Sequence, residues 1–339
     1  MNIISKLTLC VAATVGSLTA TAAPTDSISY IPQVHGTLRG RLEVSTVESS
    51  YRFQLRNARV SIGGNIAPWA DYFVQADFCD RGSIKFLDGW ARIRPFKGFS
   101  FQAGQFRMPF GVAPFRAPHT YYFANRSFIG KQMCNYRAVG TKAAYTLPST
   151  PLTVEAGVFN PGKIGDHTPW NKSLAFAGKA TYKTGNVSFS AGYMSISPDS
   201  ARTQLADGAV TWTSGRWMVE GEYMYKHYNR DRHRDAHGYN IIGNYAMPIK
   251  AGIFNRLSFQ GRFDGMTDHS TSVRDKSGTL ISDNPACNRV TGGVTLSYVR
   301  TKNMFVDIRA NYEKYFYHHD VKPTAENGDK LTLELVVRF

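Results

Sequence analysis

The chain has 339 residues, and 40 lysines and arginines against 25 aspartates and glutamates give it a formal net charge of +15 at pH 7. This basic balance favours an anionic partner, which could be a nucleic acid, an anionic lipid or a small anion. No stretch approaches about eighteen consecutive apolar residues, so helical membrane spans are excluded.

The first 22 residues have the pattern of a secretory signal peptide. Lys6 precedes an apolar stretch at 7–18, and Ala20-Thr21-Ala22 offers an A-x-A cleavage site. We therefore expect one exported domain at 23–339. It keeps three cysteines (Cys79, Cys134 and Cys287), and an odd number is not a disulfide framework. Free thiols are the default expectation, and a bridge from Cys134 to one of the others is the alternative.

Segments in which apolar and polar residues alternate recur along the whole mature chain, as in half-buried strands. The phase slips near Arg56–Asn57, which predicts a β-bulge. The last segment, KLTLELVVRF, ends on Phe339, as the closing strand of an outer-membrane barrel commonly does; an ordinary edge strand is the alternative. Sixteen strands are predicted, at 34–44, 51–66, 69–80, 84–95, 98–106, 137–147, 152–160, 173–183, 186–196, 205–213, 216–226, 238–247, 256–266, 288–300, 303–314 and 330–339.

The connections between these segments alternate in length. Short turns follow every even-numbered segment, and most connections after odd-numbered segments are longer, as in up-and-down outer-membrane barrels. The predicted fold is therefore an all-β, 16-stranded antiparallel transmembrane barrel. Barrels of about this size leave an aqueous channel, so we expect an open pore in the bacterial outer membrane.

The longest connection, 107–136, is the third outer loop, and we expect it to fold inward and narrow the pore. Together with the start of the next strand it holds five basic residues and His119, but no acidic residue. A positive constriction favours anions over cations, and the guanidinium fork suits oxyanions. The alternative is that some of these residues pair with wall acids such as Glu155 or Glu220. The five candidates are Arg107, Arg116, Arg126, Lys131 and Arg137.

Basic residues on the water-facing side of the strands extend this predicted anion path. Acidic residues share that side, so the expected field is a biased mixture of charges. The wall candidates are Arg39, Arg41, Arg59, Arg92, Arg94, Lys142 and Lys179. We find no metal-ligand spacing that indicates a metal site, and we expect no cofactor. The basic loop at 226–237 is better suited to lipopolysaccharide phosphates.

Four short motifs resemble the phosphate-selective porin O/P family in the same order. GQFRMPFG at 104–111 resembles its G-Q-[FY]-[KR]-x-P-[FY]-[GS] signature, and LRNARV at 55–60, RAVG at 137–140 and GVFN at 157–160 resemble three further pieces. The resemblance implies a homotrimeric porin with an anion-selective third loop, in which Arg107 is the basic residue at the loop's start. Pro161 stands where Gly is frequent, and Lys131 is the only loop lysine where the family has a cluster. Anion preference therefore carries over better than phosphate specificity.

The predicted function is an outer-membrane diffusion channel for small anions, with phosphate or other oxyanions as candidate solutes and no role in nucleic-acid binding. An outer-membrane barrel enzyme is one alternative, but the chain has no G-x-S-x-G element or paired Asp/His motif. A closed structural or adhesive barrel is the other alternative, and conductance would distinguish it from a pore.

Overall fold

The computed structural model describes residues 28–339 except 81, 135, 162–163, 165–169 and 198–200. The predicted signal peptide at 1–22 lies outside the described residues. Within them, no helix is long and apolar enough to cross a bilayer.

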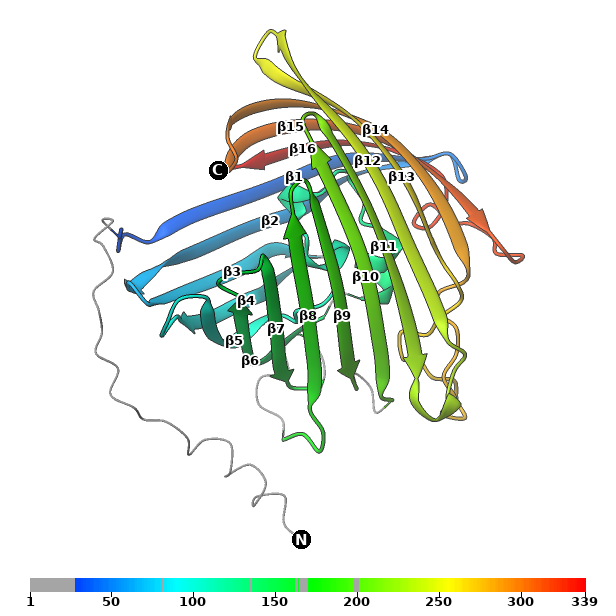
Figure 1. The fold of residues 1–339 in the computed structure, drawn as a ribbon. Helices are drawn as coiled ribbons and strands as arrows, with labels where there is room; N and C mark the ends of the chain where they lie inside the picture. The colour runs from blue at the N-terminus through cyan, green and yellow to red at the C-terminus, as the bar shows by residue number, and fades with distance from the viewer. Residues whose placement is uncertain (1–27, 81, 135, 162–163, 165–169, 198–200) are drawn as a thin grey trace.

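Sixteen antiparallel strands pair with their neighbours in chain order, and the first also pairs with the last, so the sheet closes into a barrel (Figure 1). The predicted fold class and strand count are confirmed. The strands are β1 Gln33–Ser45, β2 Ser50–Ala67, β3 Ala70–Asp80, β4 Ser83–Ile93, β5 Phe99–Arg107, β6 Arg137–Thr146, β7 Leu152–Phe159, β8 Ala175–Thr184, β9 Val187–Ile196, β10 Thr203–Ser214, β11 Trp217–Tyr228, β12 Ala236–Ala251, β13 Phe254–Met266, β14 Cys287–Thr301, β15 Met304–Tyr317 and β16 Lys330–Arg338.

The two ends of the sheet meet in a continuous register. Leu42 lies opposite Leu333 and Arg41 opposite Glu334 in the β1–β16 pairing. The backbone N–H of Gly36 donates to the carbonyl oxygen of Phe339 at 2.7 Å, and the N–H of Phe339 donates to Gly36 at 3.1 Å. A Cβ at Gly36 would meet the Phe339 ring at 2.1 Å, so the aromatic end of the chain packs where a glycine leaves room for it.

Side-chain direction follows the predicted alternation. On β16, Leu331, Leu333 and Leu335 are exposed on the outer surface, whereas Thr332 and Glu334 are buried inside the barrel. The predicted bulge in β2 is also present, because Asn57 lies opposite Arg39 and Leu55 opposite Gly40, which leaves Arg56 as the extra residue.

The connection between β5 and β6 lies inside the ring of strands, as Figure 1 shows for the segment between these labels. We call residues 108–136 the inner loop. It contains three short helices, η1 Ala113–Phe115, η2 Pro118–Thr120 and η3 Ile129–Met133; a fourth, η4 Asn229–Asp231, follows β11.

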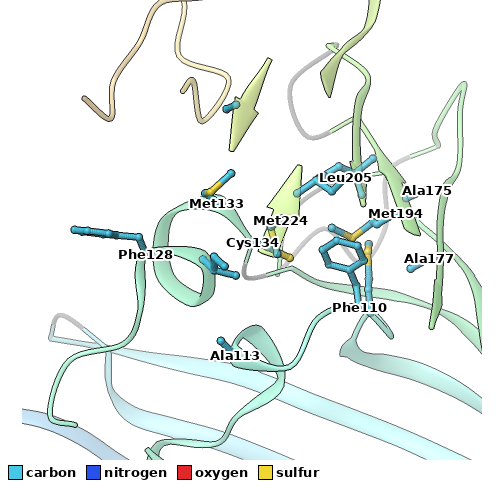
Figure 2. Close-up of a cluster of buried hydrophobic side chains, with 14 of the residues drawn as sticks. Phe110, Ala113, Phe128, Met133, Cys134, Ala175, Ala177, Met194, Leu205 and Met224 are labelled. Carbon is cyan, nitrogen blue, oxygen red and sulfur yellow. The ribbon is translucent and has the colours of Figure 1, made fainter. Parts of the chain in front are cut away.

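Apolar side chains of the inner loop pack against the barrel wall in one buried cluster (Figure 2). Phe110 and Met133 of the loop share this cluster with Met194 of β9, Leu205 of β10 and Met224 of β11. Burying large apolar side chains contributes about 1.5–3 kcal/mol each. The loop therefore has a hydrophobic attachment on the side of the lumen formed by β8–β12.

Gly104, in the motif at 104–111, has φ +132° and lies where a Cβ would come within 2.2 Å of the carbonyl oxygen of Gly89. Replacement by alanine should cost at least about 1–3 kcal/mol, because that backbone region is essentially reserved for glycine. We expect Gly104→Ala to lower the temperature at which the unheated barrel loses its folded migration in SDS gels. Gly208→Ala is the matched control, since nothing lies within 4 Å of a Cβ there. Equal transition temperatures for the two variants would contradict this account of Gly104.

Candidate functional site

The start of the inner loop is held by side chains of β8 and β11. The Glu222 carboxylate accepts the backbone N–H of Val112 at 2.7 Å and that of Ala113 at 2.8 Å. Lys179 donates to the carbonyl oxygen of Gly111 at 2.5 Å. The contacts satisfy donors and acceptors that a loop inside a barrel would otherwise leave unpaired.

The far part of the inner loop is held by the opposite wall. Arg39 of β1 donates to the carbonyl oxygen of Ala124 at 2.6 Å, and Asn311 of β15 accepts the N–H of Ala124 at 2.8 Å. On β13, Arg262 donates to the carbonyl oxygen of Asn125 at 2.8 Å. The loop is therefore fixed on both sides of the lumen.

A buried network of charges supports this second attachment. Arg289 pairs with Asp264 at 2.8 Å and with Glu313 at 3.2 Å, and Arg262 pairs with the same two carboxylates at 3.2 Å each. All four side chains are at most 4% exposed. Asp264 also accepts the N–H of Phe128 at 2.9 Å, and Arg289 donates to the carbonyl oxygen of Arg126 at 2.8 Å. These guanidinium groups position the loop. Sequence reasoning missed Arg289, although its inward phase on β14 was a usable signal.

Three of the predicted loop candidates have defined partners. Arg107 ends β5, and its guanidinium donates to the carbonyl oxygens of Pro114 and, at 2.8 Å, Arg116. Arg116 forms an ion pair with Glu220, as the alternative interpretation expected. Arg137 is buried and pairs with Asp88 at 2.9 Å. Arg107 differs from the other two because the hydrogen bonds found for it go to neutral carbonyl groups.

Tyr121 lies close to several guanidinium groups. The guanidinium carbons of Arg39 and Arg126 lie 5.2 and 5.9 Å from the centre of its ring. Burial alone would raise the pKa of Tyr121, but the charges of Arg126, Arg107, Arg39 and Arg59 outweigh burial and lower that pKa below its ordinary value of 10. The Tyr121 hydroxyl therefore lies in the combined positive potential of these four guanidinium groups.

The remaining loop candidates contribute differently. Lys131 is exposed on η3 and interacts electrostatically with Glu326, in the outer connection before β16. Burial and nearby guanidinium groups, Arg338 and Arg59 among them, lower the pKa of His119 to about 4. His119 is therefore neutral at pH 7 and adds no charge to the constriction.

Most of the wall candidates also have acidic partners. Arg92 and Arg94 share one carboxylate, that of Asp71, at 2.5 and 3.0 Å, so this group keeps one excess positive charge. The other pairs are Arg39 with Glu334 at 2.5 Å, Arg41 with Glu43 at 3.1 Å, Arg59 with Asp77 at 2.8 Å and Lys142 with Glu155 at 2.7 Å. Most of the predicted wall cations are therefore paired with carboxylates, and the excess positive charge lies at a few positions.

A cavity of about 270 Å³ lies beside the inner loop, between residues 119–122 and the wall formed by β12–β15. Among the described residues, no group of three or more His, Cys, Asp and Glu side chains could hold a metal ion. Cys79, Cys134 and Cys287 are free thiols, so the inner loop is held without a disulfide.

The sequence profile of the Gram-negative porin family matches residues 110–254, from the inner loop to the β12–β13 hairpin. A search of curated proteins finds no match. Solved structures with the same fold include an anion-selective porin from Comamonas acidovorans, with a TM-score of 0.63 and 12% identity over 91% of this chain and 99% of that one. OprB of Pseudomonas putida has a TM-score of 0.62 and 9% identity over 91% and 94%. The outer membrane channel DcaP of Acinetobacter baumannii has a TM-score of 0.61 and 12% identity over 91% and 97%.

The Glu222 contact predicts how the loop depends on its first attachment. Glu222→Ala would leave two backbone N–H groups without acceptors, at a cost of about 1–3 kcal/mol each where they stay buried. We expect the start of the loop to become mobile and single-channel current noise in planar bilayers to increase. Glu48→Ala is the control, because it removes an exposed carboxylate in the connection between β1 and β2. Unchanged noise in Glu222→Ala would show that the start of the loop is held without this carboxylate.

Proposed function

We propose that this chain is a Gram-negative porin, an outer-membrane diffusion channel rather than an enzyme, and that it passes small anions in preference to cations. The proposed path runs beside the inner loop, and its fixed positive charge comes chiefly from Arg107 and from the Arg92–Arg94 pair. Oxyanions such as phosphate are the proposed solutes.

The partners of Arg107 are the main support for this proposal. Its hydrogen bonds to the carbonyl oxygens of Pro114 and Arg116 fix the guanidinium in place without cancelling its charge. The lowered pKa of Tyr121 reports a positive potential at the same part of the loop. A fixed cation in a narrow channel lowers the energy of a passing anion and raises that of a cation.

The shared carboxylate on β3 gives independent support. Arg92 and Arg94 side chains remain 30% and 39% exposed, and Asp71 can neutralise only one of them. The guanidinium geometry suits oxyanions because it donates paired hydrogen bonds to two oxygens. The anion-selective porin from Comamonas acidovorans, which has the same fold at 12% identity, agrees with this solute class.

Two further properties belong to the same proposal. The motif at 104–111, which resembles the phosphate-selective porin O/P family, supports a homotrimer and a preference for phosphate among anions. Arg230 and Arg232, which are exposed in the connection between β11 and β12, supply positive charge for lipopolysaccharide phosphates at the outer rim. A closed structural barrel is the competing function, favoured by the apolar cluster that fills part of the lumen.

Planar-bilayer recordings test the proposal directly. We expect stepwise conductance, a reversal potential in a KCl gradient that favours chloride over potassium, and reduction of the chloride current by added phosphate. Absence of conductance would support the closed barrel, and a preference for potassium would refute anion selectivity.

Arg107→Gln measures the contribution of the central charge. A unit charge about 8 Å from an ion in a water-filled channel changes the ion's energy by about 0.5 kcal/mol, a factor of about two. We therefore expect the chloride-to-potassium permeability ratio to fall about twofold. Arg300→Gln, on the outward face of β14, removes the same charge outside the lumen and should leave the ratio unchanged. Equal ratios for Arg107→Gln and wild type would remove Arg107 from the path.

A further inference from the structure

The cavity beside the inner loop is lined by a different set of side chains from the positive constriction. Its wall carries amide and hydroxyl groups on adjacent strands, namely those of Asn244 on β12, Ser258 and Gln260 on β13, and Thr295 on β14. Asn244 lies opposite Gln260 and Ser258 opposite Thr295 in the strand register, so the four groups form one continuous polar surface.

Part of the hydrogen-bonding capacity of this surface is unused. Gln260 and Thr295 bond to each other at 3.1 Å, but within the described part of the chain the side chains of Asn244 and Ser258 have no hydrogen-bond partner. One carboxylate oxygen of Asp307 and the Nε of Arg256 are buried without a hydrogen-bond partner there. Buried polar groups normally have partners, so this surface is suited to a ligand that both donates and accepts hydrogen bonds.

The charged residues that line the cavity, and the two that lie beside them, Arg39 and Glu334, give it an excess of positive charge. Arg309 pairs with Asp307 at 2.9 Å, and Arg256 lies 3.7 Å from the same carboxylate. Arg309 also approaches Glu334 at 3.4 Å, but that carboxylate already pairs with Arg39 at 2.5 Å. Three guanidinium groups thus share two carboxylates. The cavity therefore favours a solute with a negative charge.

The inner loop forms one side of the cavity, which it lines with Tyr121 and Tyr122. These side chains combine apolar ring surface with a hydroxyl group, which matches a small solute that has both C–H and O–H groups. The volume of about 270 Å³ is near the lower limit of small-molecule pockets, about 300 Å³.

We propose that this cavity is a binding site for small polyhydroxylated anions, of the class of sugar acids and sugar phosphates. The guanidinium groups attract the acidic group, and the amides and hydroxyls of β12–β14 bind the hydroxyls. This inference rests on the proposed anion preference and names the solute class within it. The turn between β14 and β15 contributes Thr301 and Lys302 to the lining, so the site opens toward the side of the short turns, the periplasm.

Current block in planar bilayers tests the solute class. Chloride carries the current, and gluconate, acetate or glucose is added on the periplasmic side. Acetate has the charge without the hydroxyls, and glucose has the hydroxyls without the charge. We expect gluconate to halve the current at about tenfold lower concentration than either, the size of effect that one or two additional hydrogen bonds give. Equal block by gluconate and acetate, or by gluconate and glucose, would overturn the inference.

Gln260→Met tests the wall itself, because it keeps the side-chain length and removes the amide. We expect the half-blocking concentration of gluconate to rise about threefold or more, while that of acetate stays unchanged. Gln102→Met makes the same replacement at another buried lumen position, on β5, and should alter neither. Gel migration of unheated protein confirms that both variants fold. A gluconate block unaffected by Gln260→Met would remove the β12–β14 surface from the site.

The two proposals fail separately. The reversal potential in KCl measures the proposed anion preference, whereas the ratio of gluconate to acetate block compares two anions and measures recognition of hydroxyls. A potassium preference with a retained gluconate advantage would refute the proposed function alone. A chloride preference with equal block by the two anions would refute only the hydroxyl-binding site.

Discussion

A polypeptide segment that crosses the inside of a barrel must find hydrogen-bond partners for its own backbone, and this requirement organises the lumen. Glu222 supplies acceptors at the start of the inner loop, and Arg39, Asn311 and Arg262 supply donors and an acceptor further along. Leaving such groups buried and unpaired would cost about 1–3 kcal/mol each. Charged residues of the wall are therefore committed first to holding the loop, and only the remainder is available to a solute.

The use of charged wall residues to hold the loop explains why a lumen with many basic residues contains so many ion pairs. A guanidinium group has five N–H donors in a fixed fork, so one arginine can hold a loop carbonyl and a wall carboxylate together, as Arg39 does with Ala124 and Glu334. Breaking one such pair would leave its partner buried and uncompensated. Selectivity then depends on the few positions where cations outnumber carboxylates, such as the two arginines that share Asp71.

Much of the fold could be predicted because a barrel strand repeats every two residues and its outer face must be apolar. The sixteen strands, the bulge at Arg56 and the closing strand before Phe339 all follow from that local pattern. The site was less predictable. Alternation places Arg59 and Asp77 inside the barrel, but only the register of β2 against β3 puts them opposite each other. The pairing of Arg116 with Glu220 depends in addition on where the loop crosses the lumen.

The sequence by itself determined the architecture, the position of the long connection and the excess of basic residues, because alternation, turn length and charge are read along the chain. Only the tertiary structure decided which charges remain uncompensated and where a polar cavity forms. Arg39 pairs with Glu334 across 295 positions of sequence, and Tyr121 and Gln260 line the same cavity only because of the path of the inner loop. Ion pairing and cavity shape depend on distances of a few ångströms between remote segments, and neither composition nor periodicity contains those distances.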